Sequence, residues 1–515
     1  MGQAIPSLFK HYGSFQSVWV MALLGCLLGL SAPGYPFWWT AWVAFIPALF
    51  WAYQYPDSDF KKKWLGGFLF GFCFQALYCL WFFDLHPLTW LGFDELSSRL
   101  VTLAGWLLIG IEGGLLTSVF FAVYQPKTPR LVRIFGLPIL WISLFLLLNL
   151  TPMALPWGML EFTQAPISSM RWLAGATGTG LAITGLLVLH NVLWAEGLLW
   201  LKARNRMAKE ASKSWLLLMS IGSLLFPALL GGLNLWPKEP HQTADSHYPL
   251  PIAIVQANLP IEVIRSGRLS QRDIEPAYLA PIRKGQFPAG TLVLFPEEGV
   301  VPGLVSIHQP TSNGFFNTLM RLAQQKNIYI AVGVSTLGEQ NALYNSIALI
   351  SSTPHPAVTF YNKRRLVPFG EYTPYELGSR LTSLLNAFQV DYSAPYSAGL
   401  SDAPLLAGSH SLGGLLCFEL IDPLYAQRYR QKKVSLLINL SNLGWFHQNS
   451  LIENQFLAIG QIRAAESGIP LAIASNTGIS AILSASGEVL ERTQPQTQPP
   501  NPPQRQPSQL IFHQK

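Results

Sequence analysis

Charged residues are scarce in this sequence. Only 12% of its 515 residues are Asp, Glu, Lys or Arg, while 50% are hydrophobic. Because soluble domains carry about 25% charged residues, we expect part of the chain to lie in a membrane. The 17 Trp and 30 Phe residues favour the same interpretation, since aromatic side chains are enriched at bilayer interfaces. The length exceeds that of one ordinary domain and predicts at least two folding units.

Cysteines are also few, and their placement argues against a disulfide scaffold. Three of the four lie in apolar runs, where a free thiol behaves as a small hydrophobic group: Cys26, Cys73 and Cys79. Cys417 stands alone in the polar C-terminal half. The sequence has no CxxC or HExxH spacing, so we expect no metal and no other cofactor. The net charge of +7 forms no basic stripe interleaved with aromatics, which argues against a nucleic-acid partner.

Long apolar runs fill the first half of the chain. A membrane-spanning helix needs about 20 such residues. Seven runs approach or reach this length, and they predict a membrane domain of about seven transmembrane helices over residues 1–240: Val18–Ala32, Phe37–Tyr53, Trp64–Phe82, Leu100–Tyr124, Leu131–Leu150, Trp172–Leu201 and Trp215–Trp236.

The loops between these runs differ in charge. Basic residues gather after the second, fourth and sixth runs, as in Lys61–Lys63, whereas Asp84–Arg99 is net acidic. Since Lys and Arg mark the cytoplasmic side, the N-terminus is predicted to lie inside and everything after Trp236 outside. Glu112 and Glu196 fall within predicted spans, where a carboxylate indicates function. Glu196 lies near the basic end of its span and could instead pair with a neighbouring cation.

The pattern of apolar and polar residues changes from Pro249 onward. Short β-branched runs alternate with polar helical stretches, which predicts an α/β domain of layered sheets over residues 241–490. The predicted strands are Ile252–Gln256, Leu292–Phe295, Ile328–Val334, Ile347–Ile350, Gly413–Phe418, Ser435–Leu440 and Leu471–Ala474, and the predicted helices are Gln271–Lys284, Asn313–Lys326 and Asn449–Gly468. Residues 491–515 are rich in Gln and Pro; because such a segment buries little apolar surface, we expect a disordered tail.

Two predicted strands end on a reactive side chain. Leu292–Phe295 is stopped by Pro296, so Glu297 is presented at the carboxyl end of the sheet, where α/β folds usually hold ligands. In the segment Leu412–Glu419 a hydrophobic strand likewise delivers Cys417 to its end, with the acid Glu419 two residues on. Each residue has a plain alternative: a solvated loop acid for Glu297 and inert packing for Cys417, since a reactive thiol needs a base or neighbours that favour the thiolate.

A third segment, Tyr361–Glu371, contains Lys363 beside Arg364 and Arg365. Its plain alternative is a basic surface loop, or a patch that touches anionic lipid headgroups. The stretch Val367–Gly370 is apolar and turn-forming, which is unusual for a purely solvated loop. The residues alone do not distinguish Lys363 from its two basic neighbours.

Taken together, Glu297, Lys363 and Cys417 resemble, in this order, the Glu–Lys–Cys triad of the nitrilase (carbon–nitrogen hydrolase) superfamily, whose fold is a four-layered αββα sandwich. The resemblance implies that Glu297 is the general base that deprotonates the nucleophile Cys417. It also implies that Lys363 stabilises the oxyanion, helped by the backbone N–H of Phe418. The physics agrees, because a nearby cation favours a thiolate and fixed donors aimed at developing charge are a large catalytic effect.

The chain further resembles the apolipoprotein N-acyltransferase family, which completes lipoprotein maturation in the bacterial cytoplasmic (inner) membrane with its catalytic domain on the periplasmic side. The resemblance implies that the Cys417 thiolate takes an acyl chain from a phospholipid, commonly phosphatidylethanolamine. The α-amino group of a diacylated apolipoprotein then attacks the thioester. The matching motifs are Pro296-Glu297, Tyr344-Asn345, Tyr361-Asn362-Lys363, Leu366–Glu371, Cys417-Phe418-Glu419, Asn442 with Trp445-Phe446, Arg463-Ala464 with Glu466, and Asn476–Ile479.

The same resemblance implies supporting roles around the triad. Glu371 and Glu419 would orient Lys363 and hold its charge, with Asn345 as a third supporting residue. Trp236 and Trp445 would line the path of the acyl chain; alternatively, they are interface aromatics that only anchor the domain.

Two features depart from the family pattern, and two other functions stay open. Phe418 stands where a tyrosine often follows the nucleophile, and no apolar run follows Leu490, so a final membrane helix is not expected. One alternative function is a membrane-anchored nitrilase-type amidase that passes the acyl group to water. The other is a non-catalytic membrane protein for binding or transport, which predicts that Cys417→Ala is harmless.

Overall fold

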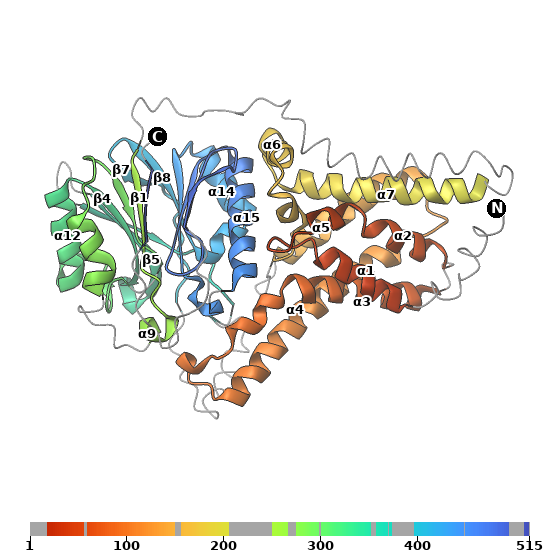
Figure 1. Ribbon diagram of the computed structural model, residues 1–515, viewed down its shortest axis with the longest axis horizontal. Helices are drawn as coiled ribbons and strands as arrows, with labels where there is room; N and C mark the ends of the chain where they lie inside the picture. The colour runs from red at the N-terminus through yellow and green to blue at the C-terminus, as the bar shows by residue number, and fades with distance from the viewer. Residues whose placement is uncertain are drawn as a thin grey trace, which may run out of the picture. The chain divides into compact units, whose positions relative to one another are not determined.

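The chain folds into two units that are described separately. In the first, the helical unit, lie Met1–Phe83, Val101–Leu173 and Gly180–Trp236; in the second, the sheet unit, lie Asp84–Leu100, Ala174–Thr179 and Pro237–Lys515 (Figure 1). A computed structural model describes residues 18–55, 59–149, 156–204, 250–265, 274–297, 300–351, 357–368, 370–372, 396–447, 449–493 and 509–513.

Apolar helices build the helical unit: α1 (Trp19–Gly29), α2 (Phe45–Tyr53), α3 (Phe60–Tyr78), α4 (Glu95–Val123), α5 (Arg130–Asn149), α6 (Ser168–Thr177) and α7 (Leu181–Arg204), with shorter turns η2 (Trp38–Trp42) and η6 (Leu160–Gln164). By length and composition, α4, α5 and residues Leu181–Trp200 of α7 can cross a membrane. Large apolar side chains such as Leu108, Ile139 and Leu147 are exposed along α4 and α5, as on a lipid-facing surface. The protein therefore carries a polytopic α-helical membrane domain.

Two of the predicted spans are not continuous helices. Phe37–Tyr53 divides into η2 and α2, because Pro47 lacks the N–H that a continuing helix needs and is tolerated in the first turn of α2. Trp172–Leu201 divides into α6 and α7 at Gly178, whose φ of 72° is left-handed. The predicted span Trp215–Trp236 lies outside the described residues, so the number of seven stays a prediction.

Glu196 of α7 pairs with Arg133 of α5. The Arg133 Nε and Nη2 atoms donate to the two carboxylate oxygens at 2.7 and 2.8 Å, and the Tyr124 hydroxyl donates to the same carboxylate at 3.2 Å. Both charged side chains are buried, with 8% and 3% of their side-chain surface exposed. The pair joins α5 to α7. Glu196 therefore pairs with a neighbouring cation, which was the alternative to a direct chemical role.

Two β-sheets form the centre of the sheet unit. The first has the order β13-β1-β2-β4-β5-β6, with the short β3 also paired to β4. Its strands are β1 (Ile252–Gln256), β2 (Leu292–Leu294), β3 (Val305–Ser306), β4 (Tyr329–Leu337), β5 (Leu343–Ser351), β6 (Ala357–Asn362) and β13 (Gln509–His513). Strands β1, β2 and β4 are parallel, whereas β5, β6 and β13 join antiparallel.

The second sheet has the order β12-β11-β10-β9-β8-β7 and a similar mixture of directions. Strands β8, β9 and β10 are parallel, and β7, β11 and β12 join antiparallel. Its strands are β7 (Leu405–Ala407), β8 (His410–Leu416), β9 (Leu436–Ser441), β10 (Leu471–Ser475), β11 (Ala481–Leu483) and β12 (Val489–Arg492). Apolar side chains from both sheets meet in one buried cluster that includes Ile254, Leu294, Leu416 and Ile438.

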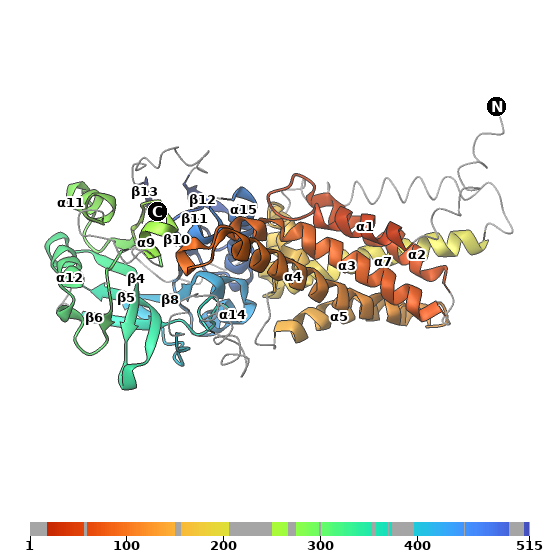
Figure 2. The same ribbon diagram turned by 90° about the horizontal axis from the view of Figure 1, so that it is seen from below.

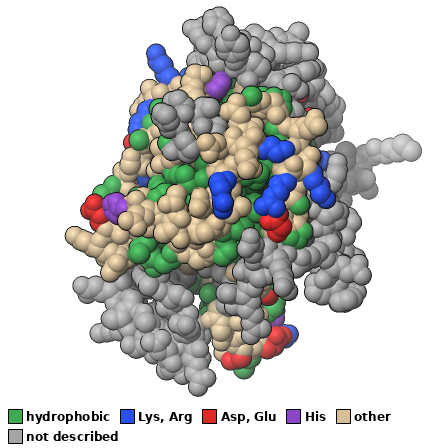
Figure 3. Space-filling view, turned by 90° about the vertical axis from the view of Figure 1, so that its left-hand side faces the viewer, with side chains coloured by type: hydrophobic (Ala, Val, Ile, Leu, Met, Phe, Trp, Pro, Cys, Tyr) green, Lys and Arg blue, Asp and Glu red, His purple; other side chains and the backbone are tan. Residues whose placement is uncertain are grey.

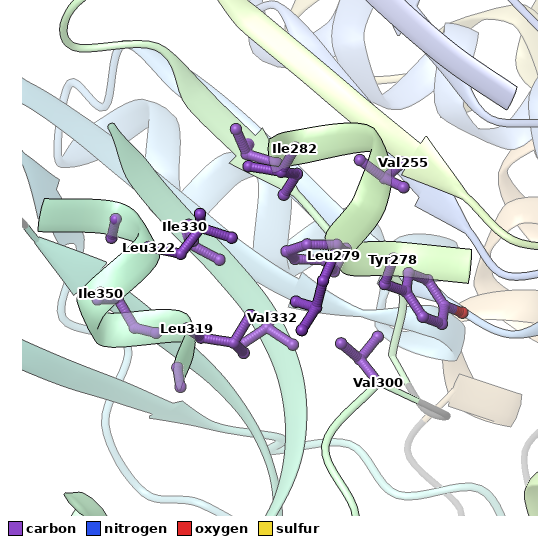
Figure 4. Close-up of a cluster of buried hydrophobic side chains, with 14 of the residues drawn as sticks. Val255, Tyr278, Leu279, Ile282, Val300, Leu319, Leu322, Ile330, Val332 and Ile350 are labelled. Atoms are coloured by element: carbon purple, nitrogen blue, oxygen red, sulfur yellow. The ribbon is translucent and has the colours of Figure 1, made fainter. Parts of the chain in front are cut away.

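Helices cover the outer face of each sheet. Over the first sheet lie the π-helical turn η7 (Glu275–Leu279), α11 (Ala280–Lys284) and α12 (Gly314–Lys326) (Figure 2). Tyr278, Leu279 and Leu319 from this layer pack against the outward-facing side chains of the sheet (Figure 4). Over the second sheet lie α14 (Pro423–Gln431) and α15 (Ser450–Ser467). The predicted four-layered αββα sandwich is confirmed.

The sequence of α12 explains both its ends and its buried face. The Asn313 side chain accepts from the backbone N–H groups of Phe315 and Phe316, and Asn327 ends the helix in the left-handed conformation with φ of 53°. The buried residues recur at helical spacing, while Arg321 and Gln324 face outward. The surface on this side of the molecule accordingly mixes charged and hydrophobic side chains (Figure 3).

All seven predicted strands overlap observed ones, but the C-terminal prediction needs correction. Residues 491–515 were expected to be a disordered tail, yet Gln509–His513 form β13 and pair antiparallel with β1. The sequence Leu510-Ile511-Phe512 explains this, since its apolar, β-favouring side chains suit a sheet edge. The unit also includes Asp84–Leu100, which was not expected: Asn449 donates a hydrogen bond to Asp84.

The Arg133–Glu196 pair leads to a stability prediction. Glu196→Gln leaves the buried Arg133 guanidinium without its counter-charge, so we expect a loss of about 3–5 kcal/mol in the free energy of unfolding. Unfolding in detergent would be followed by heat or denaturant. Glu95→Gln is the control, because it breaks the exposed Glu95–Arg99 pair and should change the midpoint little. Equal midpoints for Glu196→Gln and the wild type would contradict the prediction.

Candidate active site

Three of the predicted site residues lie just beyond the ends of strands. Glu297 follows β2 and Lys363 follows β6 in the first sheet, while Cys417 follows β8 in the second. Glu297 and Lys363 are buried, with 5% and 1% of their surface exposed. The fold therefore brings a carboxylate and an ammonium from one sheet toward a thiol from the other.

A glycine of the neighbouring strand admits the backbone of Glu297. Beyond the end of β2, the pairing with β4 continues: Phe295 N–H donates to Ala331 O at 2.9 Å and Gly333 N–H to Pro296 O at 3.1 Å. A Cβ atom at Gly333 would overlap the backbone of Glu297. Gly333 was not singled out from the sequence, although an isolated glycine within a strand is a signal for close backbone approach.

Lys363 is held between two carboxylates. Its Nζ donates to Glu297 Oε1 at 2.9 Å and to Glu371 Oε1 at 2.8 Å. Asn345 Nδ2 donates to the same two oxygens at 2.9 and 2.8 Å. Burial alone would lower the pKa of Lys363, but the two carboxylates raise it well above its usual value. The ammonium therefore stays charged at neutral pH.

Glu371 bonds to both Lys363 and Val367 and so holds the loop that follows Lys363. The second oxygen of this carboxylate, Oε2, accepts from the backbone N–H of Val367 at 2.8 Å. The ring of Trp445 lies next to this loop, since a Cβ at Gly370 would be 3.7 Å from Trp445 Cη2. Glu371, Asn345 and Trp445 thus belong to the surroundings of Lys363, whereas Trp236 lies outside the described residues.

Cys417 begins the turn η10 (Cys417–Ile421) with a left-handed φ of 45°, a conformation that non-glycine residues rarely adopt. Desolvation by the surrounding protein raises the pKa of its thiol, and the charge of Glu297 adds to the rise. The Lys363 charge and a hydrogen bond from the backbone N–H of Asn442 act in the opposite direction. At rest the sulfur is protonated, so its use as a nucleophile needs a base.

Glu419 connects the ends of β8 and β6. One oxygen accepts from the backbone N–H groups of Arg364 and Arg365 at 2.7 and 3.1 Å, and the other from Leu416 N–H at 2.8 Å. The Tyr361 hydroxyl lies 2.9 Å from both oxygens. Full burial of this carboxyl raises its pKa to about 7 in spite of these donors. Glu419 therefore supports the site through the backbone, rather than by touching the Lys363 ammonium.

The basic neighbours of Lys363 are engaged within the protein. Arg365 forms an ion pair with Asp422, and its guanidinium lies over the Phe418 ring at 5.5 Å. Arg364 lies 4.8 Å from the centre of the Tyr425 ring and 3.8 Å from Asp402. These contacts distinguish the two arginines from Lys363, which the sequence alone did not. Among the residues that the structure describes, no group of three or more His, Cys, Asp or Glu side chains could hold a metal ion.

Two models of known protein families match separate parts of this chain. Residues 24–193 match the model of the apolipoprotein N-acyltransferase N-terminal domain, and residues 273–498 match that of the carbon–nitrogen hydrolases. The chain belongs to the apolipoprotein N-acyltransferase family. It is accordingly an acyltransferase with a membrane domain and a carbon–nitrogen hydrolase domain.

Curated apolipoprotein N-acyltransferases are similar over much of the chain. The protein of Pasteurella multocida is 25% identical over 396 residues, covering 73% of this chain and 71% of its own. That of Geobacter metallireducens is 26% identical over 486 residues, covering 92% and 86%. That of Haemophilus influenzae is 34% identical over 204 residues, covering 39% and 38%. Among solved structures, the nitrilase-superfamily protein Nit3 of Saccharomyces cerevisiae covers 52% of this chain and 89% of its own, with a TM-score of 0.37 and 15% identity.

The close approach at Gly333 predicts the effect of one added methyl group. Gly333→Ala forces the Glu297 backbone away from β4, and a displacement of about 1 Å can reduce a catalytic rate about 100-fold. Gly314→Ala is the matched control, since a Cβ there meets no atom within 4 Å. Acyl transfer and thermal unfolding would be measured for both variants. A fully active, well-folded Gly333→Ala protein would show that Glu297 needs no fixed position.

The raised pKa of Glu419 predicts a pH dependence of stability. Because its folded pKa of about 7 exceeds the usual value of about 4.3, the folded state holds the proton more tightly. This contribution is present at low pH and is lost as the pH rises through 7. We expect the wild type to lose stability relative to Glu419→Gln between about pH 5 and 7. Glu339→Gln, at an exposed position, should show no such trend in melting temperature, and a parallel course for wild type and Glu419→Gln would refute the assignment.

Proposed function

We propose that this acyltransferase moves an acyl chain from a membrane phospholipid to the N-terminal amine of a diacylated apolipoprotein, through a thioester on Cys417. The observation that carries the proposal is the buried ammonium of Lys363, held by Glu297 and Glu371 within electrostatic reach of the thiol. A protonated thiol beside a carboxylate and a fixed cation has the parts that acyl transfer needs: a nucleophile, a base and a donor for the oxyanion.

In the first half-reaction Glu297 accepts the thiol proton as the Cys417 sulfur attacks the ester carbonyl of the phospholipid. The Lys363 ammonium and the backbone N–H of Phe418 stabilise the resulting oxyanion. When the tetrahedral intermediate collapses, the carbon–oxygen bond breaks and Glu297 returns its proton to the departing lysophospholipid alcohol. The acyl chain remains on Cys417 as a thioester.

The second half-reaction uses the same groups in the same order. The free α-amino group of the diacylglyceryl-cysteine attacks the thioester carbonyl, and Glu297 takes a proton from the attacking nitrogen. The carbon–sulfur bond then breaks, and that proton passes to the leaving sulfur. The enzyme recovers its thiol and the apolipoprotein carries an amide-linked third chain. No cofactor enters either step.

The membrane helices of the same chain support lipid substrates. Moving an acyl chain from lipid into water costs about 0.8 kcal/mol per CH₂, so a tethered enzyme that accepts only the ester end avoids most of this cost. We place the catalytic domain, within residues 241–490, on the periplasmic side of the inner membrane, as the loop charges predict. Trp445, whose ring lies beside the loop of Glu371, is proposed to line the acyl path.

The thioester gives the direct test. Purified protein incubated with a phospholipid carrying a labelled acyl chain should gain one acyl mass on Cys417, and neutral hydroxylamine should remove it. Cys417→Ala should abolish the adduct, while Cys26→Ala, in helix α1, should retain it. Glu297→Gln should slow its formation at least about 100-fold, because a general base contributes roughly 10²–10⁴ to a rate.

The acceptor is identified in the same reaction. Adding a diacylated lipopeptide should transfer the label to its N-terminal amine, as read by mass spectrometry. Release of free fatty acid instead would assign water as the acceptor and favour the amidase-type alternative. An active wild-type protein that never forms the Cys417 adduct would refute the mechanism.

A further inference from the structure

Three asparagines in or directly after strands β9 and β10 take no part in the mechanism above. Asn439 and Asn442 lie within and just after β9, and Asn476 follows β10. All three are buried, with exposed fractions of 0%, 1% and 0%. A buried carboxamide is costly unless it is hydrogen-bonded, so the partners of these side chains indicate what each one holds in place.

The peptide group between Ser441 and Asn442 points at the nucleophile. The parallel register sets Leu416 of β8 beside Leu440 of β9, so the N–H of this peptide, on Asn442, lies on the β8 side, where Cys417 follows Leu416; its effect is to lower the pKa of the Cys417 thiol. Its C=O, on Ser441, accepts from the backbone N–H of Asn476 at 3.0 Å. Because a peptide group is planar, holding the carbonyl on one side fixes the direction of the N–H on the other. A bond to the carbonyl also polarises the N–H toward the sulfur.

The side chains of Asn442 and Asn476 hold this peptide group in place through hydrogen bonds. Asn442 Oδ1 accepts from Gly444 N–H at 3.0 Å and from Asn476 Nδ2 at 3.2 Å. Asn476 is itself anchored to the first sheet: it exchanges hydrogen bonds with the backbone of Leu259 at 2.8 and 3.1 Å, and its Oδ1 accepts from the Tyr278 hydroxyl at 3.1 Å. The peptide that faces the thiol is thus tied to segments that follow β1, β9 and β10.

Asn439 acts on the other side of the nucleophile. Its Nδ2 donates to the carbonyl oxygen of Cys417 at 3.2 Å. Cys417 has a left-handed backbone with φ of 45°, and such a conformation persists only where the surroundings enforce it. The bond from Asn439 is one such restraint on the Cys417 backbone.

We propose that Asn442 and Asn476 are positioning residues that aim the Ser441–Asn442 peptide N–H at the Cys417 sulfur and so stabilise the thiolate, both when it attacks and when it leaves. This inference rests on the proposed role of Cys417 as the nucleophile. It adds a donor for the sulfur that is separate from the donors for the oxyanion. Lys363 and the Phe418 N–H serve the substrate oxygen, whereas the Asn442 N–H serves the thiolate.

The reactivity of the thiol measures this effect without any acyl substrate. In the intact protein, the rate of Cys417 alkylation by iodoacetamide would be followed against pH by peptide mass spectrometry. In Asn476→Ala and Asn442→Ala we expect the half-maximal pH to rise by about one unit, the equivalent of one hydrogen bond to a charged group. At pH 7 the alkylation rate should fall about tenfold. Tyr278→Phe, which removes only the hydroxyl donor to Asn476, should show a smaller shift of the same sign.

Two controls separate positioning from general stability. Asn454→Ala removes a half-buried asparagine of α15 whose Nδ2 donates to the Ser450 carbonyl, and it should leave the alkylation profile unchanged. Ile330→Val thins the core of the first sheet, where Ile330 is fully buried, and should lower the melting temperature without moving the half-maximal pH.

The outcomes are distinct from those of the thioester test. If the asparagine variants lose stability but keep the wild-type half-maximal pH, the hydrogen bonds of Asn442 and Asn476 are only structural and the inference is wrong. The same holds if Ile330→Val shifts the half-maximal pH equally. If Asn476→Ala does not fold, Asn442→Ala and Tyr278→Phe decide by the same criterion. If the variants show the expected alkylation shifts but the wild type forms no thioester, the proposed function is contradicted, while the positioning role of Asn442 and Asn476 stands.

Discussion

The site depends on one buried charge. With 1% of its side chain exposed, the Lys363 ammonium cannot be hydrated and must find its counter-charges within the protein. Glu297 and Glu371 supply them from the end of β2 and from the loop beyond β6, and Asn345 of β5 bonds to both. This requirement fixes three separate chain segments around a single nitrogen atom. The positions of the proposed base, Glu297, and of the proposed oxyanion donor, Lys363, therefore follow from the pairing that burial imposes.

A second buried carboxylate, that of Glu419, links the two sheets. Glu419 receives backbone and hydroxyl donors but no cation, and it ties Leu416 of β8 to Arg364 and Arg365 beyond β6. The Lys363 network joins parts of the first sheet, whereas Glu419 links that sheet to β8 of the second. One presents the charged groups and the other sets the distance of the Cys417 strand from them. A thiol on one sheet and its partners on the other need such a link, because the apolar layer between the sheets has no directional contacts of its own.

The sequence was informative where chemistry and local pattern coincide. Apolar runs predicted the strands, and the ends of two of them placed Glu297 and Cys417 at the candidate site. In the sequence, only the family resemblance distinguished Lys363 from its basic neighbours. Gly333 and Asn439 were missed because their importance lies in contacts with segments 36 and 22 residues away in sequence. The break in the predicted span Trp172–Leu201 lay in a Gly-Thr-Gly sequence that hydropathy averages over. The strand at Gln509–His513 was hidden by the polar, Pro-rich stretch before it.

Glu297, Lys363 and the Asn442 N–H all affect the protonation of the Cys417 thiol. A permanent thiolate beside water would be open to oxidation and to wasteful reaction. Here desolvation and Glu297 keep the sulfur protonated, and in the proposed mechanism the thiolate is favoured only when Glu297 has taken the proton. A carboxylate that has become neutral no longer opposes the developing sulfur charge, while Lys363 and the Asn442 N–H continue to favour it. In the proposed mechanism Glu297 therefore raises the pKa of the thiol at rest and stops doing so once it is protonated, which couples activation of the sulfur to the proton transfer in each half-reaction.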